Sequence, residues 1–215
     1  MPASNFTIEP VSQRLVKAIP DAVTAGVFFW VWLDPTGWRR ELVTQGLLIM
    51  LVEFILIHSG GFFGAIVFNP NESRGRRIKM LLGLGAFYCM FMLAWSLQFS
   101  SWWPLLFFLW LLGAKIVDLI FGRLAPDELR QRQMGMVGMS TLFYLLCVFA
   151  TLFLPLPKLG LIHNGHYYGV PGGGEWVDHP HVVISALVGY FGLLACAKFL
   201  AWDAAFARQA QQQNG

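Results

Sequence analysis

Four ionisable residues lie inside long apolar segments of this sequence, where a charge is costly unless it is paired. They are Glu53, His58, Lys115 and Asp118. Ionisable groups inside a membrane span are the first candidates for a functional site, because an isolated charge in hydrocarbon costs about 3 kcal/mol or more. We interpret these residues first as charges that pair to hold two helices together. The alternative is an intramembrane polar layer that serves as a proton or ion relay.

The depths of these residues decide which of them can meet. At the helical rise per residue, Glu53 lies about 17 Å and Lys115 about 20 Å below the outer ends of their segments, and His58 and Asp118 both lie about 24 Å deep. Lys115 and Asp118 share a helix face because they are three residues apart, whereas Glu53 and His58 point about 140° apart. The sequence therefore predicts a layer of Glu53, Lys115 and Asp118, and one pocket formed by all four residues is not expected.

A second group of polar residues lies in a long segment rich in glycine and proline. It holds four of the five histidines, and its candidate metal ligands are His163, His166, Asp178, His179 and His181, with Glu175 close by. Neutral imidazoles and carboxylates bind zinc and similar ions when three or four of them converge. The alternatives are a loop whose histidines and aromatic residues lie among lipid headgroups, and a pH sensor that works by histidine protonation.

Sequence signatures of catalysis and of cofactor binding are absent. The histidine spacings match no metalloenzyme motif, and the sequence contains neither His-Glu-x-x-His nor a hydrolase nucleophile elbow. Gly172-Gly173-Gly174 lacks the Lys-Ser/Thr that follows a phosphate-binding loop. The sequence thus favours a protein that is not an enzyme and has no cofactor, apart from a metal ion at the histidine-rich loop.

The composition shows which elements must position these residues. Hydrophobic residues make up 56% of the 215 residues and charged residues 13%, about half the charged share of a soluble domain. A water-soluble fold of this size could not bury so much apolar surface. The lipid bilayer is therefore the expected partner, and the formal net charge of +3 does not indicate binding to nucleic acid.

The apolar segments predict an all-α bundle of six transmembrane helices in a single integral membrane domain, residues 1–215. A helix needs about 20 apolar residues to cross the hydrocarbon. The expected spans are approximately residues 20–33, 42–68, 80–99, 102–121, 134–153 and 182–201, with an outer loop at 154–181. The first span is short. We expect it to begin near Ile19, because proline is tolerated in a first helical turn and Pro20 follows directly.

Basic residues set the expected orientation, because loops that face the cytoplasm carry an excess of lysine and arginine. With both termini inside and six spans, eleven basic residues face the cytoplasm, three face outward and Lys115 lies in the membrane. Without the first span, Arg14 and Lys17 would lie outside and count against the rule. The sequence therefore predicts a multi-pass protein of a bacterial-type inner membrane, with both termini cytoplasmic.

Three stretches of the chain carry a resemblance. They are residues 20–33, the run Glu53-Phe54-Ile55-Leu56-Ile57-His58 with its following glycines, and residues 172–181 leading into an aromatic last helix. Together they resemble a family of uncharacterised multi-pass prokaryotic membrane proteins with no assigned activity. The resemblance implies a membrane location and a similar helix count, and it implies no catalytic residue, cofactor or substrate.

Three functional classes remain open from the sequence. A transport or accessory component would use the layer of Glu53, Lys115 and Asp118 as a polar path. A membrane enzyme or metal-binding protein would use the outer histidines. A structural protein would instead bind a membrane-protein partner or a second copy of itself. The discriminating observation is which of these side chains meet inside the bundle.

Overall fold

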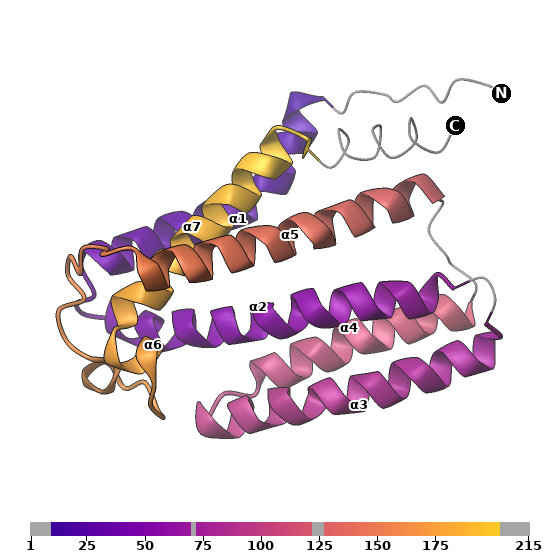
Figure 1. The fold of residues 1–215 in the computed structure, drawn as a ribbon, viewed down its shortest axis with the longest axis horizontal. Helices are drawn as coiled ribbons and strands as arrows, with labels where there is room; N and C mark the ends of the chain where they lie inside the picture. Colours follow the sequence, from indigo (N-terminus) through magenta and orange to yellow (C-terminus); the bar gives the residue numbers. More distant parts are fainter. Residues whose placement is uncertain (1–9, 70–71, 122–126, 203–215) are drawn as a thin grey trace.

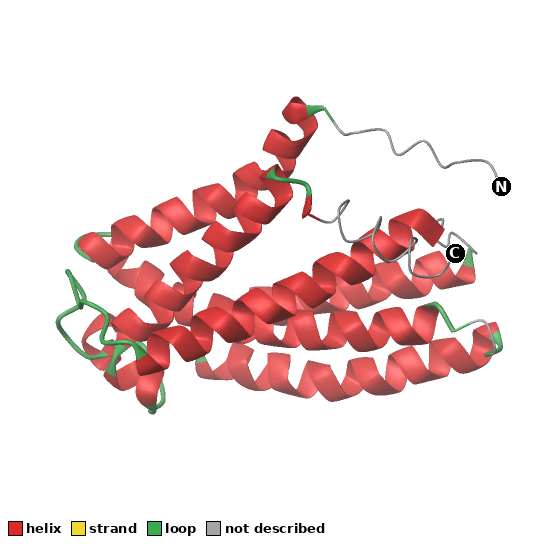
Figure 2. Ribbon diagram, turned by 45° about the horizontal axis from the view of Figure 1, so that its top comes forward, coloured by secondary structure: helices red, strands yellow, loops and turns green. Residues whose placement is uncertain are grey.

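The chain folds into a bundle of long helices. The computed structural model describes residues 10–69, 72–121 and 127–202, with 127–132 described by backbone alone. Within these ranges every regular element is helical (Figure 2). The long helices are α1 (Val11–Leu33), α2 (Arg39–Val67), α3 (Arg74–Gln98), α4 (Trp103–Ile120), α5 (Asp127–Phe153) and α7 (Pro180–Phe199). The short η1 (Gly165–Tyr168) and α6 (Glu175–Asp178) lie between α5 and α7.

Six of the described helices are long and apolar enough to cross a membrane, as the sequence predicts. The ends of α1, α3 and α5 lie at one end of the bundle with the starts of α2, α4 and α7, so successive helices run in opposite directions (Figure 1). Helices satisfy their backbone hydrogen bonds internally, which a bilayer core demands. The all-α membrane bundle is therefore confirmed.

The start of the first helix differs from the prediction. α1 begins at Val11 and contains Pro20 in its interior, whereas we expected a start near Ile19. Proline removes one backbone hydrogen bond, which membrane helices tolerate when other groups compensate. Thr24 is part of the local arrangement, since its Oγ1 donates to the Pro20 carbonyl oxygen at 2.9 Å. The residues before Pro20 therefore belong to the span, and residues just after it lie at mid-helix.

The helices divide into two groups. α2, α3, α4 and α5 run side by side, while α1 and α7 form a pair that leans away from them toward the end at which α1 begins and α7 ends (Figure 1). α7 is the most buried of the spans: 56% of its spanning window is buried, against 22% for α1 and α4. One apolar core surrounds α7 and includes residues of α1, α2 and α5. A second core joins α2 to α3 and α4.

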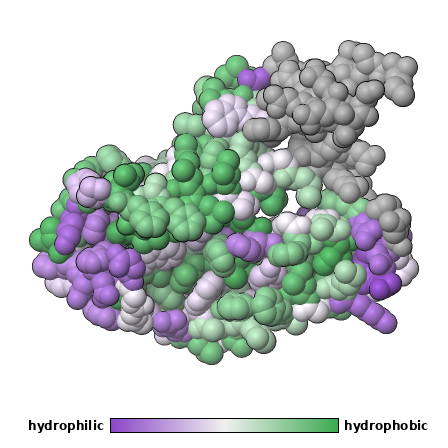
Figure 3. Space-filling view, in the orientation of Figure 1, coloured by the Kyte–Doolittle hydropathy of each residue, from purple (hydrophilic) through white to green (hydrophobic). Residues whose placement is uncertain are grey.

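The outer surface fits a lipid environment. Large apolar side chains are exposed along the spans, including Phe87, Met90, Trp110 and Leu142. On the face shown in Figure 3, hydrophobic residues cover most of the middle, with a few hydrophilic ones among them, and hydrophilic residues gather at the two ends of the four-helix group. Water would destabilise such a surface, whereas lipid tails solvate it. The chain is a multi-pass membrane protein in contact with the bilayer.

Candidate functional site

Glu53 lies near the middle of α2 and faces α7. Its Oε2 accepts a hydrogen bond from the hydroxyl of Tyr190 at 3.0 Å, and Tyr190 is buried, with 1% of its surface exposed. Buried polar groups are expected to have such a partner, because an unpaired one is costly in a medium of low dielectric constant. The bond links α2 to α7, the most buried of the spans.

Asp21 and Lys198 form an ion pair between α1 and α7. The Lys198 Nζ lies 2.5 Å from the Asp21 Oδ2, and their side chains are 29% and 10% exposed. Asp21 is close to the middle of α1, and Lys198 is in the last turn of α7. The pair therefore holds together the two helices that lean away from the rest of the bundle.

The two contacts belong to one electrostatic group. Glu53 is within the electrostatic range of both Asp21 and Lys198. Tyr144 of α5 completes the group: its ring meets that of Tyr190 edge to face, with centroids 5.6 Å apart, and its hydroxyl donates to the Met50 carbonyl oxygen at 2.9 Å. We call these five residues, Asp21, Glu53, Tyr144, Tyr190 and Lys198, the inner polar cluster.

The inner polar cluster contains two carboxyl groups and one ammonium group, so it has one negative charge in excess when both carboxyl groups are ionised. Lys198 contacts Asp21 directly, so these two charges balance each other. Glu53 has a tyrosine hydroxyl as its hydrogen-bond partner and no cationic side chain in contact among the residues described. The carboxylate of Glu53 is therefore the group of the cluster whose charge another species must neutralise.

Lys115 and Asp118 lie elsewhere, and the structure does not bring them to Glu53. Both side chains are exposed on α4. No hydrogen bond or ion pair joins either of them to any residue in the described ranges. The sequence indicates depth along the helix axis and which residues share a helix face, but it does not indicate which neighbouring helix that face meets. The expected layer of three charges is replaced by the inner polar cluster on one side and two exposed charges on α4.

His58 also lies outside the inner polar cluster. Its side chain is exposed, its Nδ1 lies 2.9 Å from the Phe54 carbonyl oxygen one turn earlier, and its ring lies 4.2 Å from the Phe54 ring between centroids. The angle of about 140° expected between Glu53 and His58 agrees with their separate surroundings.

The outer loop forms an ordered cap over one end of the bundle. The Gly160 N–H donates to the Trp32 carbonyl oxygen at 3.0 Å, and the Thr44 hydroxyl donates to the Tyr168 carbonyl oxygen at 3.2 Å. Tyr168 is buried with Leu161, Val170 and Val177. Desolvation by burial raises the pKa of Tyr168. Apolar contacts beneath the loop therefore fix its conformation.

The histidines of this cap do not gather at one point, although the rings of His179 and His181 lie edge to face with centroids 5.9 Å apart. His163 stacks against Tyr167 at 4.1 Å between centroids, and the His179 Nε2 lies 3.9 Å from the Glu175 Oε1. His166 and Asp178 are exposed, whereas His181 is buried. Across residues 10–69, 72–121 and 127–202, no three His, Cys, Asp or Glu side chains are placed so that they could hold a metal ion. The histidine spacing of the sequence is not matched by convergence in space.

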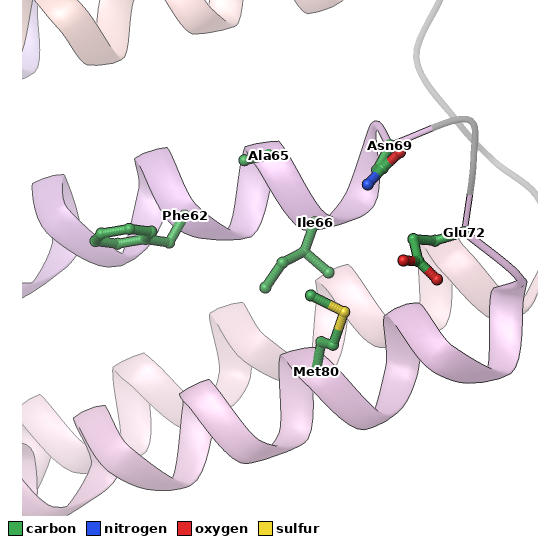
Figure 4. Close-up of a pocket in the computed structure, with 6 residues that line it drawn as sticks. All are labelled: Phe62, Ala65, Ile66, Asn69, Glu72 and Met80. Atoms are coloured by element: carbon green, nitrogen blue, oxygen red, sulfur yellow. The ribbon is translucent and has the colours of Figure 1, made fainter.

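A separate cavity of about 310 Å³ lies between α2 and α3 (Figure 4). Apolar side chains form most of its wall, and Asn69 and Glu72 lie at the end near the connection between the two helices. The Glu72 Oε2 is 3.3 Å from the Arg76 Nε. This cavity lies further along α2 than Glu53 and contains no group of residues suited to catalysis.

Of the five residues in the inner polar cluster, the sequence singles out Glu53 alone, and for Asp21 and Lys198 the reason is identifiable. The expected start of the first span near Ile19 places Asp21 at the membrane surface, and Lys198 is counted among the cytoplasmic basic residues. Val11, Leu15 and Ile19 follow one another at spacings of four residues, as on one helix face, and this pattern is the signal that extends the helix and moves Asp21 to its middle.

Comparison of the chain with protein-family models, curated proteins and solved structures finds no match. The fold and the surface define the class: a helical, multi-pass membrane protein with six candidate spans and a polar cluster inside the bundle.

Proposed function

We propose that this chain is a proton-conducting transport component of a cell membrane, and that Glu53 is the residue that takes up and releases the proton. The observation that carries the proposal is the hydrogen bond of 3.0 Å between Glu53 and Tyr190 inside the spans. Glu53 is also within electrostatic range of the Asp21–Lys198 ion pair, whose two charges already balance each other.

The ligands around Glu53 suit a proton better than a metal cation. Hard cations such as Mg²⁺ or Ca²⁺ need about six or more oxygen ligands. Among the described contacts, the oxygen ligands at Glu53 are its own carboxylate oxygens and the Tyr190 hydroxyl. A proton needs a single basic oxygen and a neighbouring hydroxyl that can both donate and accept a hydrogen bond. Glu53 and Tyr190 meet that requirement.

The inner polar cluster also extends along the bundle. Tyr190 and Lys198 are eight residues apart on α7, which corresponds to about 12 Å along the helix axis. This length is a substantial part of a hydrocarbon core of about 30 Å. The side chain of Ser140 on α5 is a further hydrogen-bonding neighbour of Tyr190. Polar groups of four helices, α1, α2, α5 and α7, therefore line the proposed path.

The proposed membrane is a bacterial-type inner membrane, with both termini in the cytoplasm. The support is the excess of basic residues on the side of the termini, ten against three once Lys198 is assigned to the inner polar cluster. A reporter that is active only in the cytoplasm, fused to the C-terminus, tests the orientation. Activity of that reporter is expected, and activity of a reporter that works only outside the cytoplasm would contradict the proposal.

The test of function is proton flux into proteoliposomes that contain the purified protein and a pH-sensitive dye. E53Q keeps the shape of the side chain and its hydrogen bond to Tyr190 but removes the basic carboxylate, so flux should fall at least about tenfold, as expected when a proton-transfer group is lost. E41Q is the matched control, because it makes the same chemical change at an exposed residue of the same helix, outside the inner polar cluster. Flux that persists in E53Q, in protein with wild-type helical content, would refute the proposal.

A further inference from the structure

The exposed face of α4 carries the second set of intramembrane charges, and the proposed proton path does not use it. Lys115 and Asp118 are both exposed there. α4 has 18 residues and is therefore about 27 Å long, slightly shorter than a hydrocarbon core of about 30 Å. Both charges consequently lie at hydrocarbon depth when α4 spans the bilayer, where each requires a partner.

The two faces of α4 differ sharply. Phe108, Leu112 and Leu119 are buried in the core shared with α2 and α3. The other side is marked by four residues at spacings of four, three and four: Phe107, Leu111, Ala114 and Asp118. Lys115 adjoins Ala114. Leu111 is half-buried and the other three are exposed. This seven-residue repeat is the pattern of a helix that packs against a second helix along one seam.

The charges on the seam of one copy are complementary to those on the seam of a second copy. In an interface with two-fold symmetry, a residue i that meets a residue j is matched by j meeting i. Lys115 and Asp118 are opposite in charge and about 4.5 Å apart along the axis. The Lys115 side chain is long enough to span that offset. Ala114, between the charges and the apolar residues, is small enough to allow the close helix approach seen in membrane helix pairs.

We infer that α4 is the interface of a homodimer, in which two copies meet about a two-fold axis along the membrane normal. Lys115 of each copy pairs with Asp118 of the other, so the interface contains two ion pairs. An unrelated partner would need the inverse arrangement of charges, whereas a second copy of this chain carries it by symmetry. The inference is independent of the function proposed for Glu53.

Charge reversal tests the inference, with dimerisation measured by energy transfer between labelled copies in liposomes over a range of protein densities. K115D gives each copy two acidic residues on the seam, and D118K gives each copy two basic residues. Each variant alone should dimerise at least about tenfold more weakly than the wild type, which corresponds to about 1.4 kcal/mol. The double variant K115D/D118K restores opposite charges and should dimerise like the wild type.

The mixture of the two single variants gives the sharpest result. An acidic seam and a basic seam complement each other, so K115D and D118K should form mixed dimers although neither dimerises well alone. This rescue also shows that both variants are folded. K79D, a reversal at an exposed residue of α3, is the matched control and should leave dimerisation unchanged.

Three outcomes would overturn the inference. The wild type could remain monomeric at every density, as expected if Lys115 extends to the headgroups. The single variants could dimerise like the wild type, which would place the interface on another helix. The mixture could fail to form dimers while both variants retain wild-type helical content, which would exclude pairing between Lys115 and Asp118.

Discussion

The inner polar cluster and the exposed face of α4 contain similar residues in opposite surroundings. In the inner polar cluster, Asp21 contacts Lys198 at 2.5 Å and Glu53 accepts a bond from Tyr190. On α4, Lys115 and Asp118 are exposed and have no such contact with any residue the structure describes. An acid and a base therefore occur in both regions, and only the first pair meets within one copy of the chain.

The difference shows that depth in the membrane is an insufficient guide to function. Glu53 and Lys115 have similar expected depths, yet Glu53 faces α7 and Lys115 is exposed on α4. The side of the helix on which a charge lies decides its partner. A charge that faces the bundle acts within the fold, whereas a charge that faces lipid requires a partner from outside the monomer.

The largest expected effect is on stability and comes from breaking the buried ion pair. D21N should lower the free energy of unfolding by about 3 kcal/mol, because it leaves the ammonium of Lys198 without its counter-charge. D118N should change stability by less than about 0.5 kcal/mol in dilute monomer, since a substitution away from any contact has little effect. Reversible unfolding in bicelles measures both. Equal losses of unfolding free energy in D21N and D118N would show that the charges of α4 are paired within the monomer as firmly as those of the inner polar cluster.

A second comparison uses two glycines, one where α1, α2 and α7 pack together and one on α4. A Cβ at Gly46 would lie 2.6 Å from the Ile184 Cδ1 and 2.7 Å from the Phe28 Cε1, and both of these side chains are buried. A Cβ at Gly113 of α4 would meet no atom within 4 Å. G46A should therefore lower stability by about 1–2 kcal/mol through overpacking.

The matched variant G113A should instead raise the free energy of unfolding. Alanine favours a helix over glycine by up to about 1 kcal/mol, and nothing opposes the added methyl group. Thermal unfolding of the two variants in one detergent gives the comparison. A stabilised G46A would show that α1, α2 and α7 approach each other less closely than the structure has them.

The smallest effect concerns a charge in water at the end of α1. A side-chain hydrogen bond with Thr36, assisted by the charge of Arg39, lowers the pKa of Asp34. A lowered pKa means that the ionised group stabilises the fold above its ordinary pKa, and that this contribution disappears as the pH falls through the lowered value. T36A should move the pKa of Asp34 upward toward its ordinary value.

Carboxyl-carbon NMR of the protein in micelles follows that titration. T24A, which changes a threonine inside α1, is the control and should leave the pKa of Asp34 unchanged. An Asp34 that titrates identically in T36A and the wild type would show that Arg39 and the Thr36 backbone N–H, which T36A retains, lower the pKa without the Thr36 side chain. The change at Asp34 is expected to be small because solvent screens an exposed group.

Much of the fold follows from the sequence because span length and apolar composition are local properties. Five of the expected spans differ from the observed helices mainly at their ends. The first helix was misjudged because Pro20 was taken as a helix start, although membrane helices accept proline inside. The resulting shift of Asp21 from the surface to mid-span is the largest consequence of that difference.

The candidate site was less predictable because it depends on which helices are neighbours. The sequence singled out Glu53, but nothing in it indicated that α7 rather than α4 faces this residue. Tyr190 and Lys198 lie on α7, whose face toward α2 is defined only by packing. The outer histidines illustrate the same limit, since their spacing along the chain predicts ligands that the fold does not bring together.

The most direct test of the contrast between the two regions is a pair of double-mutant cycles on unfolding in bicelles, at protein densities where the chain is monomeric. One cycle combines D21N with K198M, and the other combines D118N with K115M. The account predicts a coupling energy of about 1–3 kcal/mol between Asp21 and Lys198 and none resolved between Lys115 and Asp118. A coupling between Lys115 and Asp118 that equals or exceeds that of Asp21 and Lys198 would contradict it.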